Sequence, residues 1–113
     1  MNKEKRGILI TFSTKTEKFN ASERTMFFRK LYGWKQVVPN EQKTYEYERP
    51  GIIDKIPHEK VDQSSFIVPE DDVEEIMEFF EQWSSKVMLR TFKVLLEDTD
   101  VRKMFEDFEE EEE

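Results

Sequence analysis

Apolar and polar residues follow six successive patterns along the chain. Strict alternation predicts strands, and apolar positions three or four residues apart predict helices. In chain order the patterns predict a strand, a helix, two strands, a second helix and a last strand. The predicted ranges are Gly7–Ser13, Asn20–Tyr32, Thr44–Ile53, Lys60–Val68, Pro69–Ser85 and Lys86–Leu96.

The order strand–helix–strand–strand–helix–strand is that of the split βαβ, or ferredoxin-like, plan. We therefore expect an α+β fold, in which two helices cover one face of an antiparallel sheet. The other face should be free, and dimer partners or ligands commonly dock there. Because this plan hosts many unrelated activities, it predicts an architecture and no function.

Local signals support both predicted helices. Asn20 stands three residues before Glu23, which is the spacing of a capping box, and Gly33 suits a helix C-cap. Pro69 suits the first turn of the second helix. The apolar stripe of that helix is expected to anchor the core and consists of Val73, Ile76, Met77, Phe80 and Trp83.

A third amphipathic segment follows the last predicted strand. Its apolar side chains recur at helical spacing and are candidate partner-binding residues: Val101, Met104, Phe105 and Phe108. We expect a helix over Thr99–Phe108, and we expect Glu109–Glu113 to be a disordered tail that acts through long-range electrostatics. The predicted organisation is thus a ferredoxin-like domain over 1–98 and an amphipathic, acidic segment over 99–113.

Size and composition narrow the class of protein. A chain of 113 residues forms one core, and the absence of cysteine excludes disulfides, thiolate metal sites and cysteine nucleophiles. The charged start Met1–Arg6 is followed by no apolar signal region, and no apolar run reaches the roughly 20 residues of a membrane span. We expect a cytoplasmic protein that does not enter the membrane. Charged residues make up 39% of the chain, which is typical of thermophile proteins.

The net charge of −8 is unevenly distributed. Residues 1–60 carry 13 Lys and Arg against 8 Asp and Glu, whereas residues 61–113 carry 5 against 18. Cations gather around the first helix, with Tyr32 and Trp34 among them, and this mixture indicates a phosphate-binding patch. The candidate nucleic-acid-binding residues are Lys15, Lys18, Arg24, Arg29, Lys30 and Lys35. An ordinary solvated helix face is the alternative.

No motif in the sequence predicts catalysis. His58 is the single histidine, and no nucleophile stands beside it at a motif spacing, so we interpret it as a loop residue. The acidic run Glu70–Asp72 is interpreted as a helix N-terminus rather than a metal site. No glycine-rich phosphate loop is present. We therefore assign no catalytic residue, no metal ligand and no cofactor.

One short motif resembles a known family. Asp62-Gln63-Ser64-Ser65-Phe66 is similar to the stretch that opens the third strand of the small CRISPR-associated adaptation protein of the Cas-two type and its VapD-type ribonuclease relatives. Leu31-Tyr32-Gly33 is also similar. The resemblance covers Gly7–Leu96 and implies a ferredoxin-like homodimer. That family carries a metal-binding aspartate at the end of its first strand, but Ile10–Thr14 contains no acid.

Three functional hypotheses remain. The preferred one is a non-enzymatic, homodimeric ferredoxin-like module that binds a partner as a scaffold and is associated with nucleic acid or with a basic protein. Its two-fold dimer is expected to form through the sheets or the last strand. The second is a metal-dependent endonuclease of the Cas-two type. The third is a nucleic-acid-binding regulator whose acidic tail competes for the basic patch.

Overall fold

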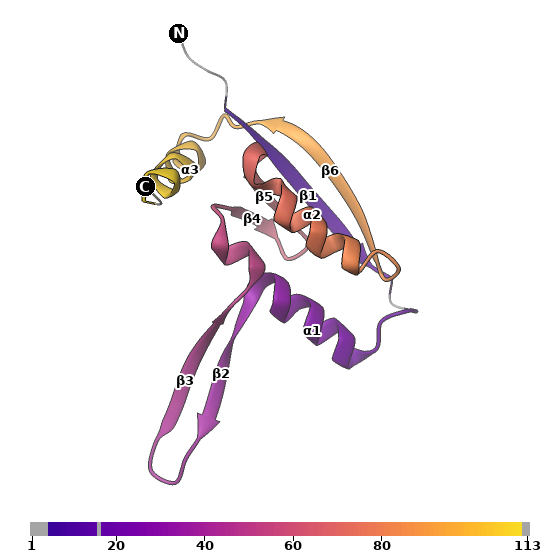
Figure 1. Cartoon of the computed structure of the whole chain (residues 1–113), viewed down its shortest axis with the longest axis vertical. Coiled ribbons are helices and arrows are strands. Elements are labelled where there is room, and N and C mark those ends of the chain that lie inside the picture. The colour runs from indigo at the N-terminus through magenta and orange to yellow at the C-terminus, as the bar shows by residue number, and fades with distance from the viewer. Residues whose placement is uncertain (1–4, 16, 112–113) are drawn as a thin grey trace.

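The computed structural model describes residues 5–15 and 17–111 of the chain. Within them, α-helices combine with antiparallel β-sheets, as the sequence predicts. The main sheet has four strands in the spatial order β4-β5-β1-β6, and each neighbouring pair is antiparallel (Figure 1). These strands span Glu59–Asp62 (β4), Ser65–Pro69 (β5), Arg6–Thr14 (β1) and Val87–Leu95 (β6). The predictions for the first and last strands are therefore confirmed to within one residue at each end.

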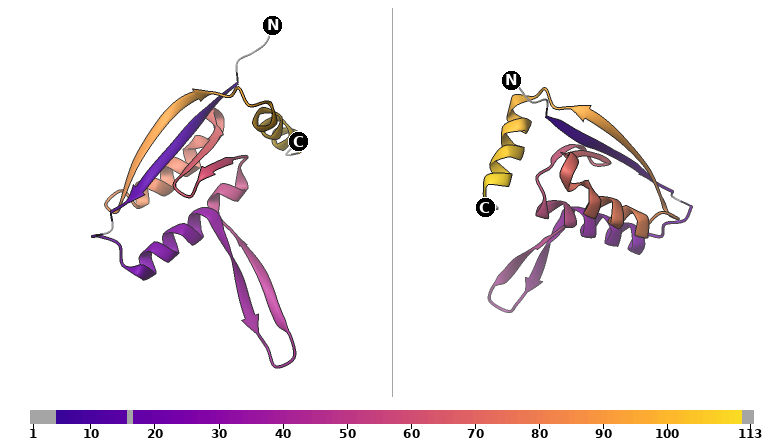
Figure 2. Two further views of the ribbon diagram at one scale, coloured as in Figure 1. Left: turned by 180° about the vertical axis from the view of Figure 1, so that it is seen from behind. Right: turned by 45° about the horizontal axis from the view of Figure 1, so that its top comes forward.

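Two helices, α1 (Ala21–Tyr32) and α2 (Val73–Gln82), lie on the same side of this sheet (Figure 2). Alternate side chains of the strands point towards them, since successive residues of a strand face opposite sides. The hydrophobic core forms between the helices and this face. Its largest fully buried side chains are Phe27, Phe66, Ile10, Leu31, Ile53, Ile76 and Val68.

Phenylalanine rings fill the centre of the core. The ring centroids of Phe12 and Phe27 are 5.5 Å apart, and those of Phe12 and Phe80 are 5.2 Å apart. At such separations aromatic pairs add about 0.5–1.5 kcal/mol each beyond the burial of their area. Strand β1 and both helices are therefore joined through one aromatic cluster.

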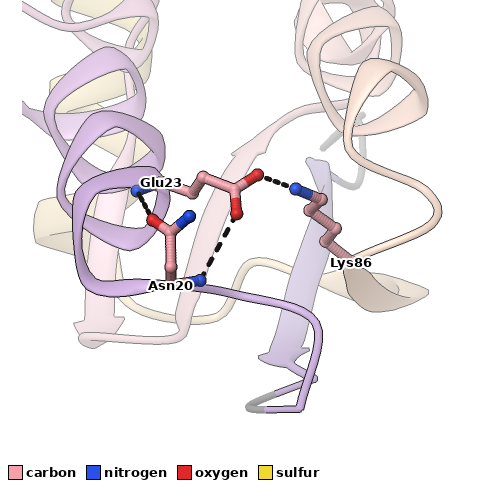
Figure 3. A network of polar contacts seen from close by, with 3 residues as sticks. All are labelled: Asn20, Glu23 and Lys86. Carbon is pink, nitrogen blue, oxygen red and sulfur yellow. Dashed lines mark hydrogen bonds and ion pairs between the residues drawn. The ribbon is translucent and has the colours of Figure 1, made fainter.

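The N-terminus of α1 is fixed by the predicted capping box (Figure 3). The Glu23 backbone N–H donates to Asn20 Oδ1 at 2.8 Å, and the Asn20 N–H donates to Glu23 Oε1 at 3.4 Å. The second carboxylate oxygen of Glu23 forms an ion pair with Lys86, the residue directly before β6. Glu23 is the one acidic residue within α1. Its charge is thus directed to the sheet and away from the outer face of the helix.

A β-hairpin projects from the body directly after α1 (Figure 1). It consists of β2 (Gly33–Pro39) and β3 (Thr44–Pro50), which form a separate two-stranded sheet. The prediction that Thr44–Ile53 lies in the main sheet is therefore wrong, and β2 was not predicted. Every residue of β3 is exposed, and its aromatic and acidic residues alternate because they lie on opposite faces of the ribbon.

Two glycines allow the hairpin to leave the body beside α1. Gly33 caps α1 with φ +82°, a conformation that side-chain-bearing residues rarely adopt. A Cβ on Gly51 would overlap the Gly33 nitrogen and the Leu31 carbonyl oxygen. The two ends of the hairpin thus approach each other and the end of α1 more closely than any other residue type permits.

The predicted third strand is in fact a second, tighter hairpin. β4 and β5 are joined by Gln63 and Ser64, and Asp62 Oδ1 accepts hydrogen bonds from the Ser64 N–H (2.7 Å) and the Ser65 hydroxyl (3.0 Å). These bonds explain why Val61–Ser65 is polar for a strand. β4, rather than Thr44–Ile53, is the strand that pairs with β5.

Tyr32 joins the end of α1 to this turn. Its hydroxyl donates to the Gln63 carbonyl oxygen at 2.6 Å, and Lys60 Nζ lies 4.3 Å from the centroid of its ring. Burial, with a smaller contribution from the negative charge of Asp62, raises the pKa of the Tyr32 hydroxyl from 10.0 to about 12. The hydroxyl therefore stays protonated and keeps donating well into the alkaline range.

Two details of the later helices differ from the predictions. In α2, which follows a 3₁₀ turn over Glu70–Asp72, Phe79 is buried, while Met77, predicted to be in the core, is 36% exposed. The last helix, α3, spans Thr99–Glu111 and so extends beyond the predicted Phe108. Glu109–Glu111 belong to this helix, so the prediction that they are disordered is wrong for these three residues. Glu112 and Glu113 lie outside the described residues.

The molecule is elongated. Its Cα radius of gyration is 16.5 Å, with principal extents of 60 × 39 × 21 Å, whereas a compact chain of this length has a radius of gyration of about 13 Å. The projecting hairpin accounts for much of the length (Figure 1). None of the helices in the described part of the chain has the length and apolarity that crossing a membrane requires.

Candidate nucleic-acid interface

A groove of about 650 Å³ lies between the outer face of α1 and the base of the β2–β3 hairpin. The groove contains two cations, an aromatic ring and hydroxyl groups, and its lining includes no carboxylate. It is lined by Ala21, Ser22, Thr25, Met26, Arg29, Lys30, Trp34 and Pro50. We call this the α1 groove.

The helical period explains which α1 residues reach the groove. Phe27 and Leu31 are buried against the sheet, so residues near the opposite side of the helix point outwards. Met26, Arg29 and Lys30 are three of these exposed residues, and Met26 is 49% exposed. One amphipathic helix therefore supplies both the core and the cationic wall of the groove.

Arg29 is held against Trp34 on the hairpin. Its guanidinium carbon lies 4.0 Å from the centroid of the Trp34 ring, which is a cation–π contact worth about 0.5–1 kcal/mol at an exposed site. Trp34 is the second residue of β2 and is partly exposed. The contact leaves the guanidinium charged and gives the groove a flat surface of ring and guanidinium.

The same chemistry continues along one face of the hairpin. Residues that are directly opposite in the β2–β3 register share a face, and the face that contains Trp34 carries no carboxylate. Arg49 lies 5.6 Å from the Tyr47 ring centroid, and its Nε–H donates to Gln36 Oε1 at 2.8 Å. We call this the aromatic face, and it consists of Trp34, Arg49, Gln36, Tyr47, Val38 and Tyr45.

The opposite face of the hairpin is acidic. It includes Lys35, Val37, Glu46 and Glu48, and Lys35 Nζ lies 3.2 Å from Glu46 Oε2. A phosphate would meet two carboxylates on this face, whereas on the aromatic face it would meet Arg49. The hairpin therefore has one face suited to a polyanion and one that is not.

The structure brings together only part of the predicted basic patch. Arg29 and Lys30 line the α1 groove, but Lys35 lies on the acidic face of the hairpin. Arg24 lies over the Phe28 ring at 5.9 Å from its centroid. Lys15 and Lys18 belong to the turn between β1 and α1, where the Lys18 N–H donates to the Lys15 carbonyl oxygen.

Sequence reasoning missed Arg49, Gln36 and the position of Trp34. Two signals were available: the β-prone segment Trp34–Val38 is followed by Pro39-Asn40, which is a turn signal, and aromatic residues alternate with charged ones from Thr44 to Arg49. Together they fit a hairpin. The prediction failed because the second run was assigned to the main sheet.

The remaining residues singled out in the sequence, His58 and the apolar stripe of α3, lie outside the α1 groove and the hairpin. The Nδ1 atom of His58 is 3.0 Å from the Ile56 carbonyl oxygen, in the loop before β4. In α3, Phe105 is only 4% exposed, while Val101, Met104 and Phe108 are partly covered. At least Phe105 therefore packs within this chain. No group of three or more potential metal-ligating side chains converges anywhere in the described residues.

Comparison with known proteins does not add to the description of the site. No family model, no curated protein and no solved structure matches the chain.

Proposed function

We propose that this protein is a non-enzymatic binding module that holds single-stranded nucleic acid along the α1 groove and the aromatic face of the hairpin. The observation that carries the proposal is the continuity of these two surfaces through Trp34: both contain aromatic rings beside arginines, and neither the lining of the groove nor the residues of the aromatic face include a carboxylate. Proteins that bind single strands combine phosphate-tracking cations with rings on which bases stack, at about 1–3 kcal/mol per stacked base.

The spacing of the groups favours a single strand over a duplex. Trp34 and Tyr47 are on one side of the ribbon, on strands that face each other in register, so their rings follow the length of the hairpin. Bases can reach such rings only when they are unpaired. Arg29, Lys30 and Arg49 lie beside the rings, and we expect them to contact the phosphates between the bases.

We also propose that the supporting domain is ferredoxin-like and that the hairpin is an insertion into it. Without β2 and β3, the order of elements is β1-α1-β4-β5-α2-β6. The sheet order β4-β5-β1-β6 supports this proposal, because the split βαβ plan sets its first and third strands side by side at the centre. The resemblance to the Cas-two type stays a prediction.

The binding proposal can be tested by fluorescence anisotropy with a labelled single-stranded RNA, its DNA equivalent and the matching duplex. We expect the single strands to bind more tightly than the duplex at about 50 mM salt, and the affinity to fall steeply as salt rises. Arg49→Ala should weaken binding by about 5-fold or more, equivalent to roughly 1 kcal/mol.

Lys35→Ala is the matched control, because it removes one positive charge from the opposite face of the same hairpin. It should change the affinity by less than about 2-fold, since the Glu46 carboxylate already neutralises Lys35. Equal losses in the two variants would indicate a general charge effect and contradict the proposed face. Preference for the duplex would contradict the proposed ligand.

Tryptophan fluorescence gives a local readout of stacking. The chain has two tryptophans, and Trp83 packs against Phe19 with ring centroids 5.7 Å apart. In a Trp83→Phe variant, Trp34 is the remaining tryptophan, and a bound single strand should quench it. The oligonucleotide should be recovered intact after incubation with Mg²⁺ or Mn²⁺. Cleavage that EDTA abolishes would instead support the nuclease alternative.

A further inference from the structure

Strand β6 forms an open edge of the main sheet. It is nine residues long, and its pairing with β1 is unbroken from Val87 to Leu95. The strand at the other edge, β4, has four residues, charged side chains and a break in register between Lys60 and Asp62. Short length, charge and bulges are the features that protect an edge from pairing with another strand. β4 has these features, whereas β6 is long and regular.

The backbone groups on the outer side of β6 can be assigned from the ladder on its inner side. The Lys86 carbonyl oxygen accepts from the Lys15 N–H, and the Leu96 N–H donates to the Lys5 carbonyl oxygen, both at 2.9 Å. In an antiparallel ladder such pairs recur at every second residue. The even-numbered residues of β6 therefore bond to β1, and the N–H and C=O groups of residues 87, 89, 91, 93 and 95 point away from the sheet.

Exposed apolar side chains accompany this edge. Met88 and Phe92 are each 49% exposed on the helix-free face, and Leu95 is 52% exposed. Phe92 continues a row across the sheet, because it is opposite Leu9, which is in turn opposite Ile67. All three views place α3 towards β4 and β5, away from the β6 edge (Figures 1 and 2).

The sequence of β6 is complementary to itself when read in the opposite direction. When Thr91 lies opposite Thr91 of a second copy, each remaining pair joins two apolar residues or one apolar and one charged residue, and no two like charges are paired. These pairs are Arg90 with Phe92, Met88 with Val94, Leu89 with Lys93, and Val87 with Leu95. The residues with outward backbone groups then meet each other, as an antiparallel ladder requires.

Neighbouring registers are less favourable. A shift by two residues in one direction sets Arg90 opposite Arg90 of the second copy, which is destabilising. A shift by two in the other direction loses two of the nine residue pairs. A shift by one residue turns the apolar rows of one copy to the wrong face of the sheet.

We propose that β6 pairs antiparallel with β6 of a second copy about a two-fold axis at Thr91, which joins the two main sheets into one. The cations of β6 are compatible with this contact. Lys93 is already paired with Glu70, at 2.7 Å between Nζ and Oε1, and Arg90 is placed over the Phe92 ring of the second copy. This assembly goes beyond the proposed binding of nucleic acid and does not depend on it.

The mass in solution tests the assembly. Light scattering on the full chain at micromolar concentration should give twice the 13.7 kDa of one chain. Thr91→Pro should yield a monomer with an unchanged circular dichroism spectrum, because it removes an N–H that points away from β1. Lys60→Pro, at the other edge of the sheet, is the control, because the Lys60 N–H also points away from the neighbouring strand, and it should remain a dimer. A monomeric wild-type protein overturns the proposal and leaves β6 free for a strand of another protein.

Single cysteines test the register, since the chain contains none. Only the residue on the two-fold axis is opposite its own copy, with Cα atoms about 5.5 Å apart, within the range of a disulfide. Under mild oxidation, Thr91→Cys should therefore cross-link to a dimer, and Arg90→Cys and Phe92→Cys should not. A dimer that cross-links best at 90 or 92, or at none of the three positions, overturns the proposed pairing.

Discussion

Contacts between arginines and aromatic rings characterise the candidate interface. The guanidinium groups of Arg24, Arg29 and Arg49 lie over aromatic rings. Lysines have mixed partners: Lys60 lies over the Tyr32 ring, whereas Lys35 and Lys93 form ion pairs with carboxylates. A guanidinium is planar and weakly hydrated, so it stacks on a ring and keeps its charge available, whereas an ammonium is a compact point charge. At the candidate interface, Arg29 and Arg49 therefore combine a positive charge with a ring contact.

Tyr32 gives a prediction on alkaline stability. Because the pKa of its hydroxyl is raised to about 12 in the folded protein, the protonated form stabilises the fold. This contribution is complete below pH 10 and is lost as the pH rises from 10 to about 12. Urea midpoints of the wild type should therefore fall over this range by more than those of Tyr32→Phe, which has no hydroxyl to titrate.

The comparison between the two proteins isolates Tyr32, since the two sequences are otherwise identical. Tyr32→Phe should also start from a lower midpoint at pH 8, because the hydrogen bond to the Gln63 carbonyl oxygen is lost. Parallel pH profiles for the two proteins would show that Tyr32 does not carry the effect.

Single residues also show how much of the site could be predicted. Arg29 and Lys30 were identified because they lie on a helix whose buried face is evident in the sequence. Arg49 could not be identified in the same way, because its position beside Trp34 depends on the pairing of β2 with β3. The same reason applies to Lys35, which the structure places on the opposite face of the hairpin from Arg49: charge is visible in a sequence, but the face of a hairpin is fixed by register.

At the scale of elements, periodic segments were predicted well and short ones were not. β1, β6 and α1 agree with their predicted ranges to within one residue, since each has a clear period or cap. The two hairpins were misassigned. Alternation predicts that a segment is extended, but it does not predict the partner strand, and pairing between distant segments decides which sheet a strand joins.

The hairpin depends on its base, which gives a prediction on Gly51. Gly51→Ala should lower the free energy of unfolding by about 1–3 kcal/mol, because the new methyl group overlaps backbone atoms that cannot move aside. The expected loss in Tm is roughly 5–20 °C, measured by circular dichroism. Thr44→Ala, at the exposed far end of β3, is the control and should melt like the wild type.

Gly51→Ala should also weaken oligonucleotide binding below its own Tm, since the hairpin then meets α1 at a different angle. A variant that melts within a degree of the wild type would show that the base of the hairpin tolerates displacement.

At the scale of the whole molecule, charge is segregated. The α1 groove and the aromatic face are cationic, while the exposed side of α2 presents Glu74, Glu75, Glu78 and Glu81, and α3 adds Asp100, Glu106 and Asp107. A net charge of −8 thus coexists with a local surface suited to phosphates. The acidic side repels a polyanion and directs it towards the groove.

The terminal glutamates give a prediction at this scale. Removing residues 109–113 should raise the affinity for a single strand by roughly 2- to 5-fold at low salt, because five negative charges are removed. The difference should vanish near 1 M salt, where the screening length is about 3 Å. Tm should hardly change, since acidic residues in the last turn of a helix are disfavoured by its dipole.

Replacement of the same five residues by glutamine keeps the length of the chain and should reproduce the effect on affinity. A gain in affinity that persists at high salt would mean that the segment blocks the groove by contact.

The exposed ribbon formed by β2 and β3 has a kinetic consequence. A two-stranded hairpin is marginally stable by itself, and here no third strand continues the ribbon among the described residues. Its amide hydrogens should therefore exchange through local opening, while those of β1 exchange only when the whole domain unfolds. A ligand held by the aromatic face must first select the closed ribbon. Its affinity is then reduced by the fraction of time that the ribbon spends open, so that stiffening the hairpin would strengthen binding without adding a contact.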